Sequence, residues 1–347
     1  MPAGDLDADV LVVGGGPVGL AAAIEARLAG LSVLVLEPRS GPVDKACGEG
    51  LMPGALAAVH RLGVDPDGHE LTGIAYVDAT RRVEHRFTRG TGRGVRRTVL
   101  HRALARRAAE LGAQVVVGRA SDLRQDAHGV VIDDLRAGHV LACDGLHSTV
   151  RRLVGLEVPV RRARADERRR FGLRRHYRVR PWGDLVEVHW APHAEAYVTP
   201  VGPDLVGVAV LGPVRTDLDA TLDALPALAR HLAGAQPDGP VRGAGPLLQR
   251  TTARTAGRVL LVGDASGYVD ALTGEGLRVG LAQAAAAVAH LDDPAGYERA
   301  WARATRDYRV LTTGLVAAAT SPARRTIVPA AARLPRVYGA IVDRLAR

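Results

Sequence analysis

A glycine-rich turn between an apolar strand and an apolar helix is the feature that most constrains the fold of this chain. Residues Asp9 to Val13 form a short apolar run typical of a buried strand, and Pro17 to Ala29 follow with a helical pattern. A second apolar strand spans Ser32 to Leu36. Together these segments predict a strand-turn-helix-strand unit, with which a parallel, doubly wound α/β sheet commonly begins.

The turn reads Gly14-Gly15-Gly16-Pro17-Val18-Gly19, and each of its spaced glycines has a physical task. Gly14 permits the tight turn, Gly16 lets a pyrophosphate approach the backbone, and Gly19 lets the helix pack closely on the strand. The helix begins with Pro17 and Val18, and the free backbone N–H groups of its first turn face the phosphates. The turn therefore predicts a dinucleotide site.

The acidic residue at the end of the second strand narrows the ligand. Glu37 stands 18 residues after Gly19. Its carboxylate is placed to accept hydrogen bonds from ribose hydroxyls and to repel a 2′-phosphate. The site is thus predicted to hold the adenosine of FAD or NAD rather than that of NADP.

Later patterns extend this domain. A helical pattern from Thr98 to Leu111 leads into a strand at Gln114 to Val117, and Val140 to Cys143 forms another apolar strand. Near the end, a strand at Arg258 to Val262 precedes an alanine-rich helix from Leu277 to His290. These segments predict further layers of the same α/β domain.

Two intervening stretches have a different pattern. Ile74 to Asp78, Val83 to Phe87 and parts of Phe171 to Leu211 alternate apolar and polar residues, which predicts an antiparallel sheet. Most of the aromatic residues lie there, and they serve either as a substrate-pocket wall or as an ordinary sheet core. The most basic run, Arg161 to Arg180, alternates with apolar residues and predicts a strand with one solvated face.

Composition excludes several classes of function. The formal net charge is +9, but Lys45 is the only lysine, so the charge reflects a general excess of arginine and does not indicate a nucleic-acid surface. Cys47 and Cys143 are far apart and lie outside any metal-ligand spacing, so we expect neither a metal site nor a disulfide. The chain shows no leader pattern and no long apolar span, so we expect a cytoplasmic protein.

A segment near the C-terminal end resembles a known flavoprotein motif. Val259 to Leu277 contains Gly263-Asp264-Ala265 and, after a loop, Thr273-Gly274-Glu275-Gly276-Leu277. It is similar to the second FAD motif of the superfamily that contains aromatic-ring hydroxylases, geranylgeranyl reductases and flavin halogenases. The resemblance implies that Asp264 binds the ribityl chain and that the helix start at Gly274, Gly276 and Leu277 faces the flavin pyrimidine. The positive end of that helix would favour the negative charge of reduced flavin.

Two further matches follow from this resemblance. Ala142-Cys143-Asp144-Gly145, with the residues up to Arg152, resembles the Asp-Gly motif of the superfamily, so Asp144 would support FAD and a transient nicotinamide nucleotide. Arg97 stands where relatives place an arginine or glutamine on the FAD phosphates, which an arginine fork fits well. Arg39 is either a second phosphate ligand or a solvated surface residue.

The resemblance implies an α/β fold: a doubly wound, Rossmann-like FAD-binding domain with an inserted antiparallel-sheet substrate domain. We assign residues 1–70, 97–155 and 245–310 to the FAD-binding domain and residues 71–96 and 156–244 to the substrate domain. Residues 311–347 form a C-terminal helical segment, for which packing on the core and peripheral membrane contact are the two alternatives.

The residues near the expected flavin suggest two reactions. Cys47-Gly48-Glu49-Gly50 resembles the segment that geranylgeranyl reductases place near flavin and substrate, where Cys47 either donates a proton or packs. Glu195-Ala196-Tyr197 stands where halogenases and reductases carry a pair of aromatic residues, of which Tyr197 alone remains. This loss disfavours a halogenase and favours a smaller or more polar substrate than a long prenyl chain. We name Cys47 and Tyr197 as candidate catalytic residues.

The leading hypothesis is an FAD-dependent monooxygenase of an aromatic or polyketide-like small molecule. NAD(P)H would reduce the flavin transiently, or a flavin-reducing partner would supply electrons, because a second nucleotide fingerprint is missing. The alternative within the superfamily is an alkene reductase of the geranylgeranyl reductase type. A non-enzymatic protein that binds nucleotides or nucleic acids is the alternative from another class, and it rests on net charge alone.

Overall fold

The glycine turn lies at the centre of a mostly parallel sheet. The computed structural model describes residues 6–158 and 169–347. Strand β1 (Ala8–Val13) pairs in parallel with β2 (Val33–Glu37) on one side and with β11 (Leu135–Ala142) on the other. Beyond them lie β8 (Gln114–Val117) and β18 (Val259–Leu261), also parallel. The order β18-β11-β1-β2-β8 confirms the doubly wound arrangement.

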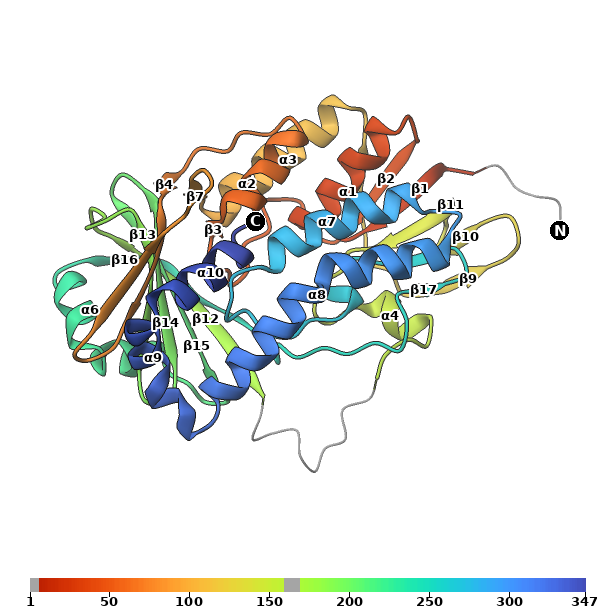
Figure 1. The fold of residues 1–347 in the computed structure, drawn as a ribbon. Coiled ribbons are helices and arrows are strands. Elements are labelled where there is room, and N and C mark those ends of the chain that lie inside the picture. Colours follow the sequence, from red (N-terminus) through yellow and green to blue (C-terminus); the bar gives the residue numbers. More distant parts are fainter. Residues whose placement is uncertain (1–5, 159–168) are drawn as a thin grey trace.

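Shorter elements complete this first layer. Three strands add antiparallel pairs to the sheet: β9 (Leu123–Gln125), β10 (Val130–Ile132) and β17 (Thr255–Ala256). Helices surround the sheet, as Figure 1 shows: α1 (Pro17–Leu28), α3 (Arg97–Glu110), α4 (Thr149–Leu153), α7 (Gly276–Ala289) and α8 (Pro294–Ala319). Helix α2 (Pro53–Arg61) packs on α7. Side chains of β1, α1, α3 and α7 share one buried apolar cluster, so burial of these faces holds the helices in place.

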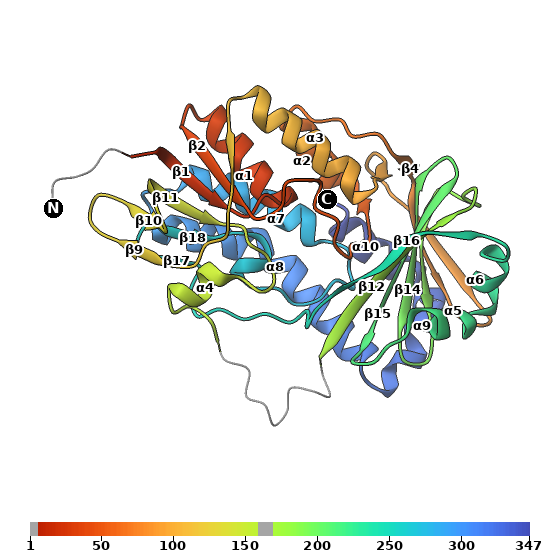
Figure 2. The same ribbon diagram turned by 180° about the vertical axis from the view of Figure 1, so that it is seen from behind.

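A second, seven-stranded sheet stands beside the first (Figure 2). Its order is β16 (Gln236–Ala244), β12 (Arg170–Arg178), β15 (Leu205–Pro213), β14 (Glu195–Gly202), β13 (Leu185–Trp190), β5 (Gly73–Val77) and β6 (Arg82–Arg86). All pairs are antiparallel except β13 with β5, so the predicted antiparallel sheet is present. A small three-stranded sheet consists of β3 (Gly50–Leu51), β7 (Gly92–Gly94) and β4 (His69–Leu71).

Helices cover both faces of the seven-stranded sheet. On one face α5 (Leu218–Asp223) and α6 (Pro226–His231) bury their leucines against β14 and β15. The other face meets the C-terminal elements η3 (Pro322–Thr326), α9 (Ile327–Arg333) and α10 (Pro335–Leu345), as Figure 1 shows. Helix α8 runs unbroken through residue 310, where we expected the C-terminal segment to begin. In the part of the chain described, no helix is both long and apolar enough to cross a membrane.

Strand β12 corrects the prediction made for the most basic run, of which residues 161–168 lie outside the described part. The alternate side chains of Arg170, Arg174 and His176 are buried, not solvated. Arg170 donates to Asp270 at 3.0 Å and to Glu195 at 2.7 Å. The sequence pattern misled because buried arginines paired with carboxylates have the same alternation as exposed ones.

The ion pairs at Glu195 yield a stability prediction. Glu195 is fully buried and accepts hydrogen bonds from both Arg170 and Arg324. Because Glu195→Gln leaves these buried cations short of compensating charge, we expect it to lower the free energy of unfolding by about 3–5 kcal/mol. Urea denaturation measures this change. The matched control Glu84→Gln removes a half-exposed partner of Arg82 and should cost under about 1 kcal/mol; equal effects of the two substitutions would contradict the prediction.

Candidate cofactor site

The glycine turn has open space at one position only. Gly14 has a φ of +101°, and a Cβ placed there would lie 2.6 Å from the carbonyl oxygen of Cys143. A Cβ on Gly19 would lie 1.8 Å from the carbonyl oxygen of Gly14. A Cβ on Gly16, by contrast, would meet nothing within 4 Å. Gly14 and Gly19 therefore serve packing, whereas Gly16 borders a space that a pyrophosphate can enter.

The start of α1 faces this space. Gly16 is its N-cap and offers no side-chain cap, and Pro17 is its first residue, so the first N–H groups remain available to an anion. Val18 points the other way. Its side chain packs against Gly280, where an added Cβ would come within 2.4 Å, and against Gly263. The glycine turn is thus packed against the Gly263-Asp264 segment through Val18.

Glu37 lies beside the turn and is hydrogen-bonded to it. Its Oε2 accepts a hydrogen bond from the Gly15 N–H at 2.8 Å, and its Oε1 accepts one from the Arg39 N–H at 3.2 Å. The Arg39 guanidinium is half-exposed and pairs with the same Oε1 at 3.4 Å. The structure therefore brings Arg39 to Glu37, at the adenosine end of the site.

The Asp-Gly segment leaves one polar atom without a partner. Oδ2 of Asp144 accepts hydrogen bonds from the N–H groups of Thr149 and Val150 at 2.7 and 3.1 Å. Its Oδ1 is buried and has no protein partner in the described structure. Such an orphaned acceptor costs free energy unless a ligand donates to it. FAD hydroxyls provide donors of this kind.

Arg151 joins the Asp-Gly segment to the second motif, a role that the sequence analysis missed. It is fully buried and donates to the carbonyl oxygens of Ala265 and Leu146 at 3.1 and 2.9 Å and to Gln249 at 2.9 Å. Its position in the matched segment was the one signal that could have found it. Its burial could not be read from a run of two arginines.

Three cations surround Asp264. Burial raises the pKa of its carboxyl, while the positive charges of Arg97, Lys45 and Arg151 oppose that rise. The residue is partly exposed, and its carboxylate makes no hydrogen bond within the described residues. A free carboxylate for ribityl hydroxyls, set beside cations for phosphates, matches the donor and acceptor groups of FAD.

The loop after Asp264 ends at the start of α7. Gly274 has a φ of +71°, and a Cβ there would meet nothing within 4 Å, so this glycine also borders open space. A Cβ on Gly276 would lie 3.2 Å from the Tyr268 ring, and Leu277 packs against the apolar core. Glu275 caps α7 without a side-chain hydrogen bond to the helix, so the first N–H groups of α7 stay available. These residues fit the pyrimidine edge of a flavin.

Glu49 in the Cys-Gly-Glu-Gly segment makes buried contacts that the sequence analysis missed. It has a φ of +60° and is buried. Its Oε1 accepts from the Arg97 N–H at 2.8 Å, and its Oε2 pairs with Nε2 of His176 at 2.6 Å. Arg174 donates to Nδ1 of His176 at 3.1 Å. Because arginine can only donate, Nδ1 must accept, so Nε2 carries the proton that binds Glu49.

The two candidate catalytic residues lie in different settings. Cys47 is a partly buried free thiol, and the Glu49 N–H donates to its Sγ at 3.4 Å. The hydroxyl of Tyr197 donates to the carbonyl oxygen of Leu272 at 2.7 Å. Burial raises the pKa of Tyr197 well above 10, and the charge of Glu195 adds to the rise, so the phenol keeps its proton. Tyr197 therefore holds the loop that leads to α7.

Comparison with known proteins agrees with this geometry. Residues 7–169 match the family described as FAD binding domain. Rifampicin monooxygenase of Streptomyces venezuelae is 37% identical over 171 residues, which cover 46% of this chain and 36% of that protein. Menaquinone reductase of Mycolicibacterium smegmatis is 34% identical over 174 residues, covering 43% of this chain and 40% of that protein. The matched parts therefore span about two fifths of these relatives.

Similarity to solved structures extends over nearly the whole chain. A flavin-dependent brominase superposes with a TM-score of 0.83 at 16% sequence identity, covering 98% of this chain and 94% of the brominase. At this identity the match establishes the fold. Both layers of the molecule thus belong to one known architecture.

Gly16 permits a direct test of the pyrophosphate site. Gly16→Ala should destabilise the apoprotein by no more than about 1 kcal/mol, since the added methyl meets no protein atom, the backbone angles of Gly16 suit alanine, and alanine is only a somewhat poorer N-cap. It should weaken FAD binding at least roughly tenfold, because the methyl takes up ligand space. Flavin fluorescence titration measures the affinity. Gly314→Ala, also in open space but on α8, is the control; unchanged FAD affinity in Gly16→Ala would place the pyrophosphate elsewhere.

Glu275 predicts a pH dependence of stability. Burial raises the pKa of this carboxyl to about 7 from 4.5, against the opposing charge of Arg278, and its Oε1 lacks a partner in the described structure. The protonated form is favoured on folding, so its contribution is complete below pH 4.5 and is lost as pH rises through about 7. Urea denaturation of the apoprotein should therefore show wild type losing stability relative to Glu275→Gln over this range. The exposed substitution Glu110→Gln should show no such pH-dependent difference, and a constant difference for Glu275→Gln would refute the assignment.

Proposed function

We propose that this chain is a flavin monooxygenase of the FAD-dependent superfamily that contains aromatic-ring hydroxylases, geranylgeranyl reductases and flavin halogenases, with which it shares sequence and fold similarity. Its substrate is an aromatic or polyketide-like small molecule. NAD(P)H, or a partner reductase, supplies the electrons. One oxygen atom of O2 enters the substrate, and the other leaves as water.

The observation that carries this proposal is an apolar wall between the loop after Asp264 and the seven-stranded sheet. Leu272 and Tyr268 of the loop lie in one cluster with Trp190, Tyr197 and Leu211 of the sheet. Such a wall excludes water from the reacting centre, which oxygen transfer requires more than it requires a protein acid. The similarity of 171 residues of this chain to rifampicin monooxygenase supports the same reaction class.

The residues of this chain divide the work of holding the cofactor. The α1 start and Arg97 would bind the phosphates, Glu37 the adenosine ribose, and Asp264 the ribityl chain. The first N–H groups of α7 would face the flavin pyrimidine. FAD bound there supplies two-electron reduction by NAD(P)H and the activation of O2.

Residues of the seven-stranded sheet would form the substrate side of the site. Tyr197 fixes Leu272 through its carbonyl oxygen, so the sheet sets the position of the loop that the cofactor contacts. Trp190 lies close by, and its buried Nε1–H has no partner within the described residues. That donor is available to a carbonyl or phenolic oxygen of the substrate, which an oxygenated polyketide-like molecule would provide.

Isotopically labelled O2 tests the reaction. Protein loaded with FAD and given NAD(P)H should transfer labelled oxygen to an aromatic or polyketide-like acceptor, as mass spectrometry of the product detects. Substrate-stimulated NAD(P)H oxidation should accompany the transfer. Saturation of an alkene by the reduced protein without O2, and no labelled product, would instead make the protein an alkene reductase.

Cys47 discriminates the two reactions. In a monooxygenase Cys47→Ala should retain the chemical step, because no protein acid is obligatory. In an alkene reductase it should slow that step by roughly 10²–10⁴-fold, as expected when a general acid is lost. Single-turnover kinetics give the rate. The control Cys143→Ala removes a buried thiol next to Gly14 and leaves the thiol of Cys47 in place.

A further inference from the structure

Helix α10 carries apolar side chains on two faces. Tyr338, Val342 and Leu345 point inward and are buried. Val337 and Ile341, one turn apart, remain 52% and 39% exposed. A surface helix ordinarily has one apolar face, so a second, outward one calls for a contact that the chain itself does not make.

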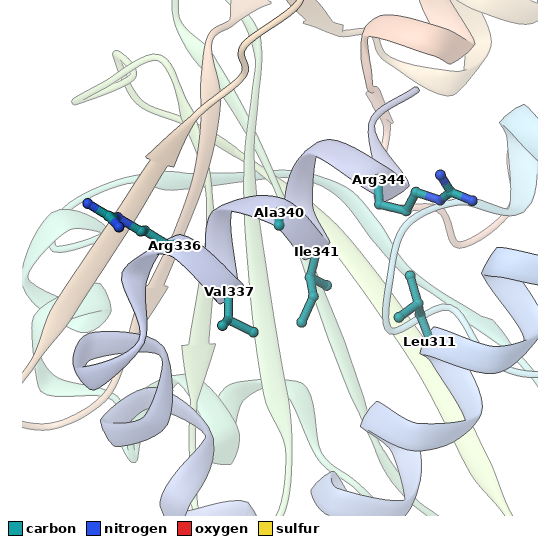
Figure 3. A pocket seen from close by; sticks show the side chains of 6 residues that line it. All are labelled: Leu311, Arg336, Val337, Ala340, Ile341 and Arg344. Carbon is teal, nitrogen blue, oxygen red and sulfur yellow. The ribbon is translucent and has the colours of Figure 1, made fainter.

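The outward face forms one side of a groove with α8. Figure 3 shows Val337 and Ile341 projecting from the same side of α10, with Leu311 of α8 beyond Ile341. The groove has a volume of about 420 Å³, and Arg336 and Arg344 stand along it. Its lining is otherwise aliphatic, with Ala340 as the remaining member. The groove thus combines an apolar floor with arginines at its edges.

Two arginines, Arg336 and Arg344, line the groove, and other exposed arginines lie on the elements that form it or adjoin it. The exposed arginines of α8, η3, α9 and α10 include Arg303, Arg306, Arg309, Arg325, Arg333, Arg336 and Arg344. The nearby carboxylates are already engaged. Asp307 pairs with Arg344 at 2.7 Å, and Asp343 accepts from the Thr88 N–H at 3.1 Å and pairs with His85. Within the described residues Arg336 and Arg333 make no ion pair.

We propose that this groove, between α8 and α10, is a docking surface for an anionic lipid bilayer. Val337, Ile341 and Leu311 enter the boundary between headgroups and acyl chains, and the arginines bind lipid phosphates. The charge argues against a second copy of the chain as the occupant, because two arginine-rich faces would repel each other. A polyanion without acyl chains, such as nucleic acid, would leave the apolar floor uncovered.

The position of α10 connects this surface to the cofactor site. The carbonyl oxygen of Ala346, just past its end, accepts from the Gly54 N–H at 2.8 Å. Ala346 also lies in one apolar cluster with Met52. Both contacts are on the segment that follows Cys47. Docking would therefore place the bilayer on a helix whose C-terminal end contacts this segment.

Vesicle co-sedimentation of the full chain tests the proposal. Vesicles of phosphatidylcholine containing phosphatidylglycerol should sediment the wild-type protein, and pure phosphatidylcholine vesicles should sediment much less. Raising the salt concentration should weaken the binding. Arg333→Gln with Arg336→Gln should weaken the partition roughly fivefold for each arginine removed. Val337→Ser with Ile341→Ser should also reduce it severalfold.

Matched controls separate this surface from general charge and stickiness. Arg106→Gln with Arg124→Gln removes two exposed arginines elsewhere, and Val214→Ser with Val241→Ser removes two exposed valines elsewhere. Both should bind vesicles as wild type does. Circular dichroism and FAD content should be unchanged in every variant, which shows that folding is intact.

Three results would overturn the proposal. One is equal sedimentation with anionic and neutral vesicles. Another is wild-type partition in the Val337→Ser with Ile341→Ser variant. The third is a concentration-dependent dimer, seen by light scattering, that the same substitutions abolish, since the occupant would then be a second copy.

Discussion

Three buried polar side chains on one face of β12, two arginines and a neutral histidine, are the constraint on which the site depends. Side chains alternate along a strand, so Arg170, Arg174 and His176 all point to the same side of the sheet. Arg170 binds Asp270 of the loop before α7, and Arg174 pairs with Asp44. His176 binds Glu49. One strand of the second sheet thus binds both the loop before α7 and the segment from Asp44 to Glu49, which border the proposed cofactor space.

This arrangement explains why the charges stay buried. A buried cation without a partner costs several kcal/mol, so Arg170 and Arg174 are stable only beside their carboxylates. The neutral His176 needs Glu49 as the acceptor for its buried N–H. The pairs therefore fix the two sheets in one relative position. Tyr197 adds a neutral hydrogen bond to the same loop at Leu272, and Glu49 extends the network to the start of α3 at Arg97. The proposed cofactor space is therefore bordered by the contacts between the seven-stranded sheet and the loops of the first domain.

The sequence predicts the parts of the site that have local signals. The glycine turn, Glu37 and the Gly-Asp segment follow apolar strands at fixed spacings, so spacing and hydrophobic pattern alone predict their elements and order. The antiparallel sheet also followed from alternation. The helix patterns were accurate to within a residue or two because periodic burial is a strong signal.

The contacts between distant segments had no such signal. The burial of Arg151, Arg174 and His176 depends on partners far along the chain, and an arginine beside apolar residues gives the same pattern on a solvated strand. The sequence analysis named Glu49 only as part of the Cys-Gly-Glu-Gly segment and gave it no role of its own. Its two hydrogen bonds arise from α3 and β12, which no local spacing brings together.

The central claim is that these segments form a single FAD site, and titration of the apoprotein with FAD tests it most directly. Flavin fluorescence should change on binding and saturate at one FAD per chain, and NAD should fail to displace it. Fluorescence that the protein leaves unchanged, or ready displacement of FAD by NAD, would contradict the account.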